Sequence, residues 1–277
     1  MRLIGTDEQD AVANFLNHHA ATSMFPLENL QRHGMQSDHP RGCSFWVNDA
    51  AGEITDVLTI SNEGIVFPQC PSGFWDAAAD VLRGLKIKGF IGAAGQVAAI
   101  REKIGLTKPA QLDEIEPFYK LTLGDLVLPN ISDFQLKPLT AVSRDILLVW
   151  RAAYSVESLA IPSEDAVLQA EVDIEHYIKA DSHRVLLRDG VPISMTGFNA
   201  MSPHTVQVGG VYTPPALRSN GYARAALALH LGEAHAHGVN QAVLFAANPA
   251  AEKAYQALGF VRDGSFALKL YEEPQHV

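Results

Sequence analysis

The sequence has few cysteines, no long apolar run and no excess of positive charge. Its two cysteines, Cys43 and Cys70, lie outside any CxxC spacing, so neither a metal site nor a redox pair is predicted from them. No apolar stretch is long enough to cross a bilayer, and the polar residues at positions 6–10 interrupt any N-terminal signal peptide. We therefore expect a soluble, cytoplasmic protein without a membrane partner.

The charge balance is acidic: 21 lysines and arginines stand against 31 aspartates and glutamates, for a net charge of −10. A nucleic-acid-binding protein usually carries a basic stripe, and the sequence has none, so no nucleic-acid partner is expected. The acidity instead favours a cationic or neutral small partner. With 277 residues, 47% of them hydrophobic, the chain suits one large domain or two of ordinary size.

Four histidines, at positions 18, 19, 33 and 39, are spread over the first half. A metal site would need them to converge, and nothing in their spacing indicates that they do. Surface histidines are the favoured interpretation, and we expect no metal.

The hydrophobic periodicity and turn residues predict alternating helices and strands. In the first half they predict helices at 7–19, 24–33, 74–84 and 96–104, and strands at 44–47, 54–61, 65–67, 87–91 and 118–123. In the second half they predict helices at 140–158, 163–179, 219–237 and 249–258, and strands at 184–188, 193–199, 205–212, 242–246 and 266–271. Segment 126–138, with two prolines and a polar patch, is predicted to be a linker or an extended crossover, which places a domain boundary near Asn130. The order indicates an α/β fold (α+β, mixed sheet) with a break where strand 205–212 diverges from strand 242–246.

One stretch organises the second half: VYTPPALRSNGYAR, residues 211–224. It predicts a strand end, a Pro-Pro elbow, a short polar loop and the first turn of a helix. Amide groups at a helix start bind anions, Gly221 lets the backbone approach closely, and Arg218 adds a cation. The loop is therefore a candidate phosphate site, although an ordinary strand–loop–helix connection would have a similar sequence.

Two segments together resemble a known family. VYTPPALRSNGYARAAL resembles the acetyl-CoA-binding motif of the GNAT superfamily of N-acetyltransferases, and AVLFAANPAAEKAYQALGFV resembles its second motif. The resemblance extends from about Leu136 to the C-terminus. It implies the acyl-CoA N-acyltransferase (GNAT) fold, acetyl-CoA as cosubstrate, and a catalytic domain at 131–277.

The resemblance also implies residue roles. The cofactor would be bound by Val211, Tyr212 and Thr213, with backbone groups of Val211 and Thr213 pairing with the pantetheine arm. The pyrophosphate would be held by the amides of Arg218, Ser219, Asn220, Gly221, Tyr222 and Ala223. Asn248 would bind the cofactor near the thioester or pantetheine, Tyr255 would protonate the departing thiolate, and the N–H of Val211 would stabilise the oxyanion. Without the family context, Tyr255 would be a core aromatic and Asn248 a plain helix N-cap.

One departure concerns the general base. The family often has a glutamate on the strand before the phosphate loop, whereas strand 205–210 here has no carboxylate. The base stays open among a water chain and four side chains: Glu157, Glu171, His176 and His204.

The first half resembles a second, altered copy. When Gly105 is aligned with Gly259, the segment IGAAGQVAAIREKIGL falls on FAANPAAEKAYQALGF. Ala94 then replaces Asn248, and Arg101 replaces Tyr255. We expect residues 1–130 to form a degenerate GNAT-like domain without a phosphate loop. Chance similarity between two alanine-rich helices is the alternative.

The leading functional hypothesis is an N-acetyltransferase that moves an acetyl group from acetyl-CoA to a primary amine by direct attack. The amine, on a small molecule or a peptide, is not specified by the sequence. The alternative is a catalytically weak acyl-CoA-binding sensor or interaction protein. The missing strand glutamate favours the sensor, and the Asn248–Tyr255 pair favours the enzyme.

Overall fold

The computed structural model describes residues 1–159, 161–246 and 248–277, and the chain forms two compact units. Unit 1 comprises Met1–Phe118 and Asp263–Val277, and unit 2 comprises Tyr119–Arg262. The expected boundary near Asn130 falls inside unit 2, and the end of the chain packs with unit 1. Which segment acts as the catalytic domain stays a prediction.

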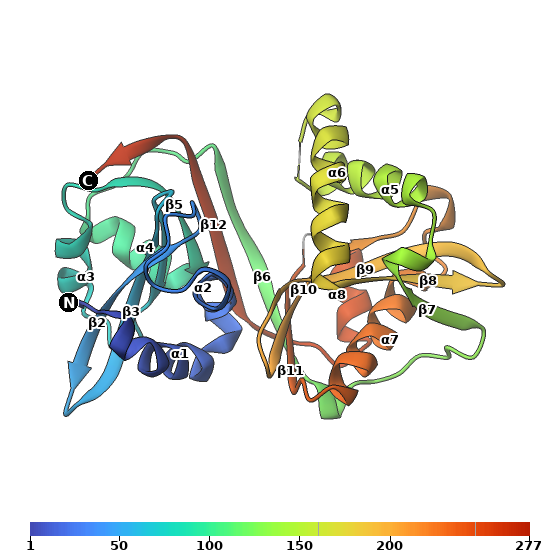
Figure 1. Cartoon of the computed structure of the whole chain (residues 1–277), viewed down its shortest axis with the longest axis horizontal. Coiled ribbons are helices and arrows are strands. Elements are labelled where there is room, and N and C mark those ends of the chain that lie inside the picture. The colour runs from blue at the N-terminus through green and yellow to red at the C-terminus, as the bar shows by residue number, and fades with distance from the viewer. Residues whose placement is uncertain (160, 247) are drawn as a thin grey trace. The chain divides into compact units, whose positions relative to one another are not determined.

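Unit 1 is a sheet covered by helices (Figure 1). Its strands follow the order β1 (Arg2–Leu3), β2 (Cys43–Ala50), β3 (Glu53–Ser61), β4 (Ile65–Gln69), β5 (Lys86–Ala93) and β12 (Val261–His276). Its helices are α1 (Gln9–His18), α2 (Ala20–His33), α3 (Trp75–Leu82) and α4 (Ala94–Lys103). Strands β2 to β4 form an antiparallel meander, and β5 lies parallel to β4. The predicted turns at 48–52 and 62–64 make these hairpins because their glycines, Gly52 and Gly64, adopt positive φ.

Unit 2 carries the candidate site. Its strands follow the order β6 (Leu112–Thr122), β11 (Gln241–Phe245), β10 (Thr205–Tyr212), β9 (Val191–Met201), β8 (His183–Arg188) and β7 (Phe134–Pro138). Only the end of β6, from Tyr119, belongs to unit 2. Its helices are α5 (Arg144–Leu159), α6 (Ser163–Ala180), α7 (Tyr222–Ala236) and α8 (Pro249–Gln256). The interpretation of 126–138 as a linker is wrong at its end, because β7 pairs with β8 from Phe134 to Pro138. This strand is at the sheet edge, where a closing proline is tolerated.

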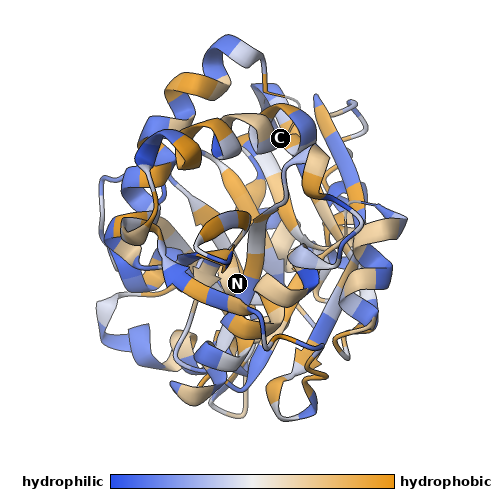
Figure 2. Cartoon of the chain, turned by 90° about the vertical axis from the view of Figure 1, so that its right-hand side faces the viewer, coloured by the Kyte–Doolittle hydropathy of each residue, from blue (hydrophilic) through white to orange (hydrophobic). Residues whose placement is uncertain are grey.

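The helices of unit 2 lie on both faces of its sheet. Helices α5 and α6 pack on one face around Trp150, Ile174 and Met195, and α7 packs on the other around Leu227 and Leu231. Figure 2 shows hydrophobic and hydrophilic residues alternating along the helical ribbons, as expected for helices with one face on a sheet. Within the described ranges, no helix is long and apolar enough to cross a membrane.

The two units repeat one order of elements: an antiparallel meander, a crossover helix, a parallel strand and a further helix. Each unit also takes a strand from the other half of the sequence. β12, in red in Figure 1, pairs with β5 from Phe266↔Ala93 to His276↔Lys86. The last residues of β6, Tyr119 and Leu121, lie in the core of unit 2. Strand 266–271, predicted to close the second half, therefore completes unit 1.

The predicted divergence of β10 from β11 is present, and two irregularities accompany it. The described parallel pairs run from Thr205↔Gln241 to Gln207↔Val243. Beyond Gln207 the pairing of β10 with β9 shifts register twice, first at Gln207/Val208 and then between Gly209 and Tyr212. Such bulges bend and twist a strand. The consecutive glycines, one of them at φ +63° (Gly210), allow the second bulge.

Candidate active site

The polar loop after β10 is exposed and ends at the first turn of α7. The helix begins at Tyr222, later than predicted, so residues 219–221 lie in the loop rather than in the helix. Ser219 and Gly221 adopt positive φ, of 66° and 77°. The side-chain amide of Asn220 donates to the carbonyl oxygens of Leu217 (3.1 Å) and Arg218 (3.0 Å), which closes the loop from within. The loop conformation is thus set by its own residues.

The amide groups of this loop are available to a ligand. Within the part of the chain that the structure describes, the N–H groups at positions 219–224 donate to no protein acceptor. The first N–H groups of any helix lack an intrahelical partner and carry partial positive charge. Consecutive free N–H groups at a helix start form an anion site. The loop therefore presents the free amides that a phosphate site requires, and its role as a phosphate site stays a prediction.

Arg218 connects the loop to the end of β10 and to α5. Its Nε donates to the carbonyl oxygen of Thr213 at 2.9 Å, and an Nη atom pairs with Glu157 Oε2 at 2.6 Å. Its guanidinium carbon also lies 5.7 Å from the centre of the Tyr212 ring. Burial is the main cause of a raised pKa at Tyr212; Glu157 adds to the shift and Arg218 opposes it. The guanidinium is partly exposed and stays able to contact an anion.

Val211 lies in the second bulge of β10. The described pairs with β9 run from Gly209↔Gly197 to Tyr212↔Met195, so β10 contains one residue more than β9 between them. The residues between these pairs, Gly210 and Val211, have no opposite residue among the described pairs. A bulge releases a backbone group from the ladder, and this is the feature that the predicted oxyanion role of Val211 requires.

Asn248 is the N-cap of α8. Its Oδ1 accepts a hydrogen bond from the backbone N–H of Ala251 at 2.9 Å, and Pro249 occupies the first helical position. The residue is exposed, and its amide nitrogen makes no hydrogen bond to the described residues. The capping role is thus present in the structure, and the other end of the same side chain is available to a ligand. Ala247, in the same predicted motif, lies outside the described residues.

Tyr255 is on α8, about 10 Å further along the helix axis than Asn248. It is half-buried against the core of unit 2, with its ring centre 6.0 Å from that of Phe260. Since β10 and β11 are parallel, their carboxyl ends lie at the same edge of the sheet. The bulge, the loop after β10 and the start of α8 after β11 are therefore gathered at one edge.

Comparisons with known proteins agree with this arrangement. Residues 149–260 match the model of the Acetyltransferase (GNAT) family. The chain carries a GNAT domain. Because GNAT proteins transfer acyl groups from acyl-CoA, the match implies acyl transfer from acyl-CoA for this domain. No curated protein matches the sequence closely enough to count as a relative.

Solved structures with the same fold cover almost the whole chain. A Drosophila protein is similar with a TM-score of 0.65 at 14% identity, over 97% of each chain. A GCN5-related N-acetyltransferase from Sphaerobacter thermophilus has a TM-score of 0.56 at 13% identity, over 100% of this chain and 96% of its own. A tandem GNAT protein of the clavulanic acid biosynthesis pathway has a TM-score of 0.55 at 13% identity, over 95% of this chain and 93% of its own. These likenesses show a GNAT fold.

The four side chains considered as general base differ in how close they lie to the predicted site of the GNAT domain. Glu157 pairs with Arg218 beside the loop, whereas Glu171 is exposed and pairs with Arg144. His176 is exposed on α6. His204 is exposed in the turn before β10, seven strand residues or about 23 Å from Val211. Of the four, Glu157 is the one that the described contacts tie to the predicted site.

One buried group beside the bulge of the GNAT domain was missed from the sequence. His183, on β8, stacks on Tyr177 with ring centres 3.6 Å apart, and its Nδ1 lies 2.9 Å from Ser182 Oγ. A Cβ at Gly197 would lie 2.1 Å from the ring, and one at Gly210 would lie 2.8 Å from Nε2. Burial lowers the pKa of His183 well below its usual range, so the imidazole is neutral. A single histidine in an apolar strand gives no sequence signal, because the glycines that make room for it are on other strands.

Proposed function

We propose that this protein is an acetyl-CoA-dependent N-acetyltransferase and that its chemistry is confined to unit 2. The observation that supports this most strongly is the row of free amides at 219–224, at the start of α7 and beside the bulge of β10. Unit 1 has a related order of elements but carries Ala94 and Arg101 where unit 2 has Asn248 and Tyr255. We infer a tandem of two GNAT-like halves, the first of which is degenerate.

The residues present fit acyl-CoA. The loop amides and Arg218 would hold the pyrophosphate, and the polar backbone of Val211 and Thr213 would pair with the pantetheine arm in the manner of an added strand. Asn248 would donate its free amide N–H to the same arm while its oxygen caps α8. When bound, the cosubstrate supplies a thioester carbonyl that an amine can attack.

The protein's own groups would lower the barrier at three points. The N–H of Val211, released by the bulge, would stabilise the negative charge that develops on the thioester oxygen. Tyr255 would give its phenolic proton to the departing sulfur. Glu157, or water beside it, would take a proton from the ammonium group of the acceptor, so that the neutral amine can attack the thioester carbonyl. The acidic chain suits a cationic amine as acceptor.

A catalytically weak acyl-CoA sensor is the second candidate. The observation that favours it is the ion pair between Glu157 and Arg218, which occupies the carboxylate that contacts Arg218. A sensor would bind acetyl-CoA and release no CoA in the presence of amines.

The test is an acetyl-transfer assay on the full chain with a panel of small amines and peptides, in which free CoA and product mass are both measured. The enzyme hypothesis predicts an acetylated product with stoichiometric CoA. Tyr255→Phe should then lower kcat by more than it raises the Kd of acetyl-CoA, and an unchanged kcat would refute the proton-donor role. Binding without any product across the panel would favour the sensor.

A further inference from the structure

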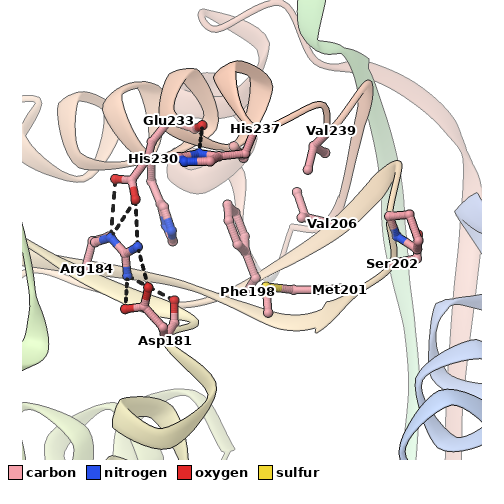
Figure 3. Close-up of a pocket in the computed structure, with 12 residues that line it drawn as sticks. Asp181, Arg184, Phe198, Met201, Ser202, Val206, His230, Glu233, His237 and Val239 are labelled. Carbon is pink, nitrogen blue, oxygen red and sulfur yellow. Dashed lines mark hydrogen bonds and ion pairs between the residues drawn. The ribbon is translucent and has the colours of Figure 1, made fainter.

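Unit 2 has a hollow at the far end of α7 from the polar loop after β10. It is a depression of about 430 Å³ between the last turns of α7, the end of β9 and the start of β10. Figure 3 shows Glu233, Arg184 and Asp181 stacked along one side, with His230 and Phe198 side by side in the middle. Because α7 has 15 residues, this end lies about 20 Å from the phosphate loop.

The charges around the depression favour a cation. Arg184 donates to Glu233 Oε1 at 2.6 Å and to Asp181 Oδ1 at 2.8 Å, so one guanidinium is shared by two carboxylates. Arg184 also donates to the second oxygen of each carboxylate and to the backbone carbonyls of Asp181 and His183. The C-terminal end of a helix adds partial negative charge. His237, on the same side, donates from Nδ1 to the carbonyl oxygen of Glu233 (2.8 Å). The two carboxylates, Asp181 and Glu233, and the guanidinium of Arg184 together carry one net negative charge.

A buried imidazole at the bottom of the depression lacks a partner. His230 is 2% exposed, and its Nδ1 makes no hydrogen bond within the described residues. Its ring stacks on Phe198 with centres 3.9 Å apart. Burial, with the nearby Arg184, lowers its pKa to about 3, so it is neutral at physiological pH. Buried polar atoms are nearly always hydrogen-bonded, so an unpartnered one at the bottom of a hollow points to a ligand group.

Apolar side chains complete the wall. Phe198, Met201, Val206 and Val239 lie on the side away from the carboxylates (Figure 3). A volume of this size suits a small molecule rather than a peptide. The wall combines an apolar surface with a negatively charged side.

We propose that this depression is a second ligand site of unit 2, which binds a small organic ammonium ion with an apolar or aromatic body. The ammonium group lies against Glu233 and His230, and the body lies on Met201 and Phe198. The site is distinct from the predicted cofactor site, because the two are at opposite ends of α7. Anions bind at the N-terminal end of this helix and cations at its C-terminal end, as the helix dipole favours at each.

The test uses the full chain with ¹³C-methyl-labelled methionine and three probes of one shape: 2-phenylethylammonium, neutral 2-phenylethanol and phenylacetate. Met201 lines the depression, and its signal is assigned with Met201→Leu. Met195, on the same strand but buried against α5 and α6, is the matched control. We expect the ammonium probe to shift the Met201 signal in a saturable way and to leave Met195 unmoved. Phenylethanol should bind up to about fivefold more weakly, because one exposed charge contact is worth up to about 1 kcal/mol, and phenylacetate should bind more weakly still.

Glu233→Gln should weaken ammonium binding by about fivefold, and Glu175→Gln, an exposed change on α6, should leave it unchanged. The proposal is overturned if Met201 does not move, if Met195 alone responds, if the three probes bind equally, or if a folded Glu233→Gln binds like the wild type. If Glu233→Gln fails to fold, the comparison of the three probes on the wild-type protein decides.

Discussion

Arg218 and Glu157 form an ion pair of 2.6 Å that joins the polar loop after β10 to helix α5. The pair holds the one cationic side chain of the loop, among the described residues 218–223, against a carboxylate. A phosphate that enters the loop must therefore share Arg218 with Glu157. This relationship makes Glu157 either a competitor of the cofactor or a participant in the chemistry.

Replacing Glu157 separates these two roles. Glu157→Gln should tighten CoA binding by about two- to fivefold, because an exposed pair of this kind is worth about 0.2–1 kcal/mol. Arg218→Gln should weaken CoA binding, and more so at low salt. Binding is measured by calorimetry. If Glu157→Gln instead abolishes turnover and the acidic limb of the pH–rate profile without tightening binding, Glu157 is the general base.

Because Gly210 lies in the bulge of β10, replacing it should strongly reduce the stability of the fold. Gly210→Ala should lower the free energy of unfolding by about 2 kcal/mol, because alanine is strained at φ +63° and its Cβ would meet His183. Urea denaturation measures the change. Gly232→Ala, in the middle of α7 with open space around it, is the matched control and should stabilise by about 1 kcal/mol. Combining Gly210→Ala with His183→Ala should cost less than the two single changes together; strict additivity would show that the contact is unimportant.

Asn248 has a capping end and a free end, and two substitutions separate them. Asn248→Asp keeps the oxygen that accepts from Ala251, so the free energy of unfolding should stay within about 0.5 kcal/mol of the wild type, whereas Asn248→Ala should lose about 1 kcal/mol. Both lack the amide N–H, so both should bind acetyl-CoA more weakly. Full affinity in Asn248→Asp would mean that the residue is only a cap.

Acid should destabilise the fold through His230. Unfolded, its imidazole binds a proton below about pH 6.5, whereas in the folded protein its pKa is about 3. Unfolding therefore takes up a proton between these values, and stability falls as pH falls through that window. By pH 5 the loss attributable to His230 is about 2 kcal/mol. His230→Phe should flatten the dependence of urea midpoint on pH between 7 and 5, while His235→Gln, an exposed change on α7, should not; equal slopes in all three proteins would contradict the assignment.

The features predicted well from sequence depend on short segments. The loop 218–223, the N-cap at Asn248 and the strand Thr205–Tyr212 follow from neighbouring glycines, prolines and apolar alternation. The sequence could not predict that β12 completes unit 1 and that the end of β6 completes unit 2. The apolar pattern of a strand shows that it is buried but does not show which strand it pairs with. β7 was missed because its five residues become a strand only by pairing with β8. His183 was missed because its environment is made by residues on two other strands and on α6.

The central claim is that the loop at the start of α7 binds the pyrophosphate of acetyl-CoA. Gly221 adopts φ +77°, a conformation that asparagine and aspartate tolerate, and a Cβ there would meet no atom closer than 3.7 Å. Gly221→Asn and Gly221→Asp therefore place side chains of equal size in the loop, one neutral and one negative. Calorimetry on the full chain should show one acetyl-CoA site in the wild type, a modestly weaker one in Gly221→Asn, and at least tenfold weaker binding still in Gly221→Asp, because about 1.4 kcal/mol of repulsion suffices for that factor. Equal affinity in the two variants, or no acetyl-CoA binding by the wild type, would contradict the account.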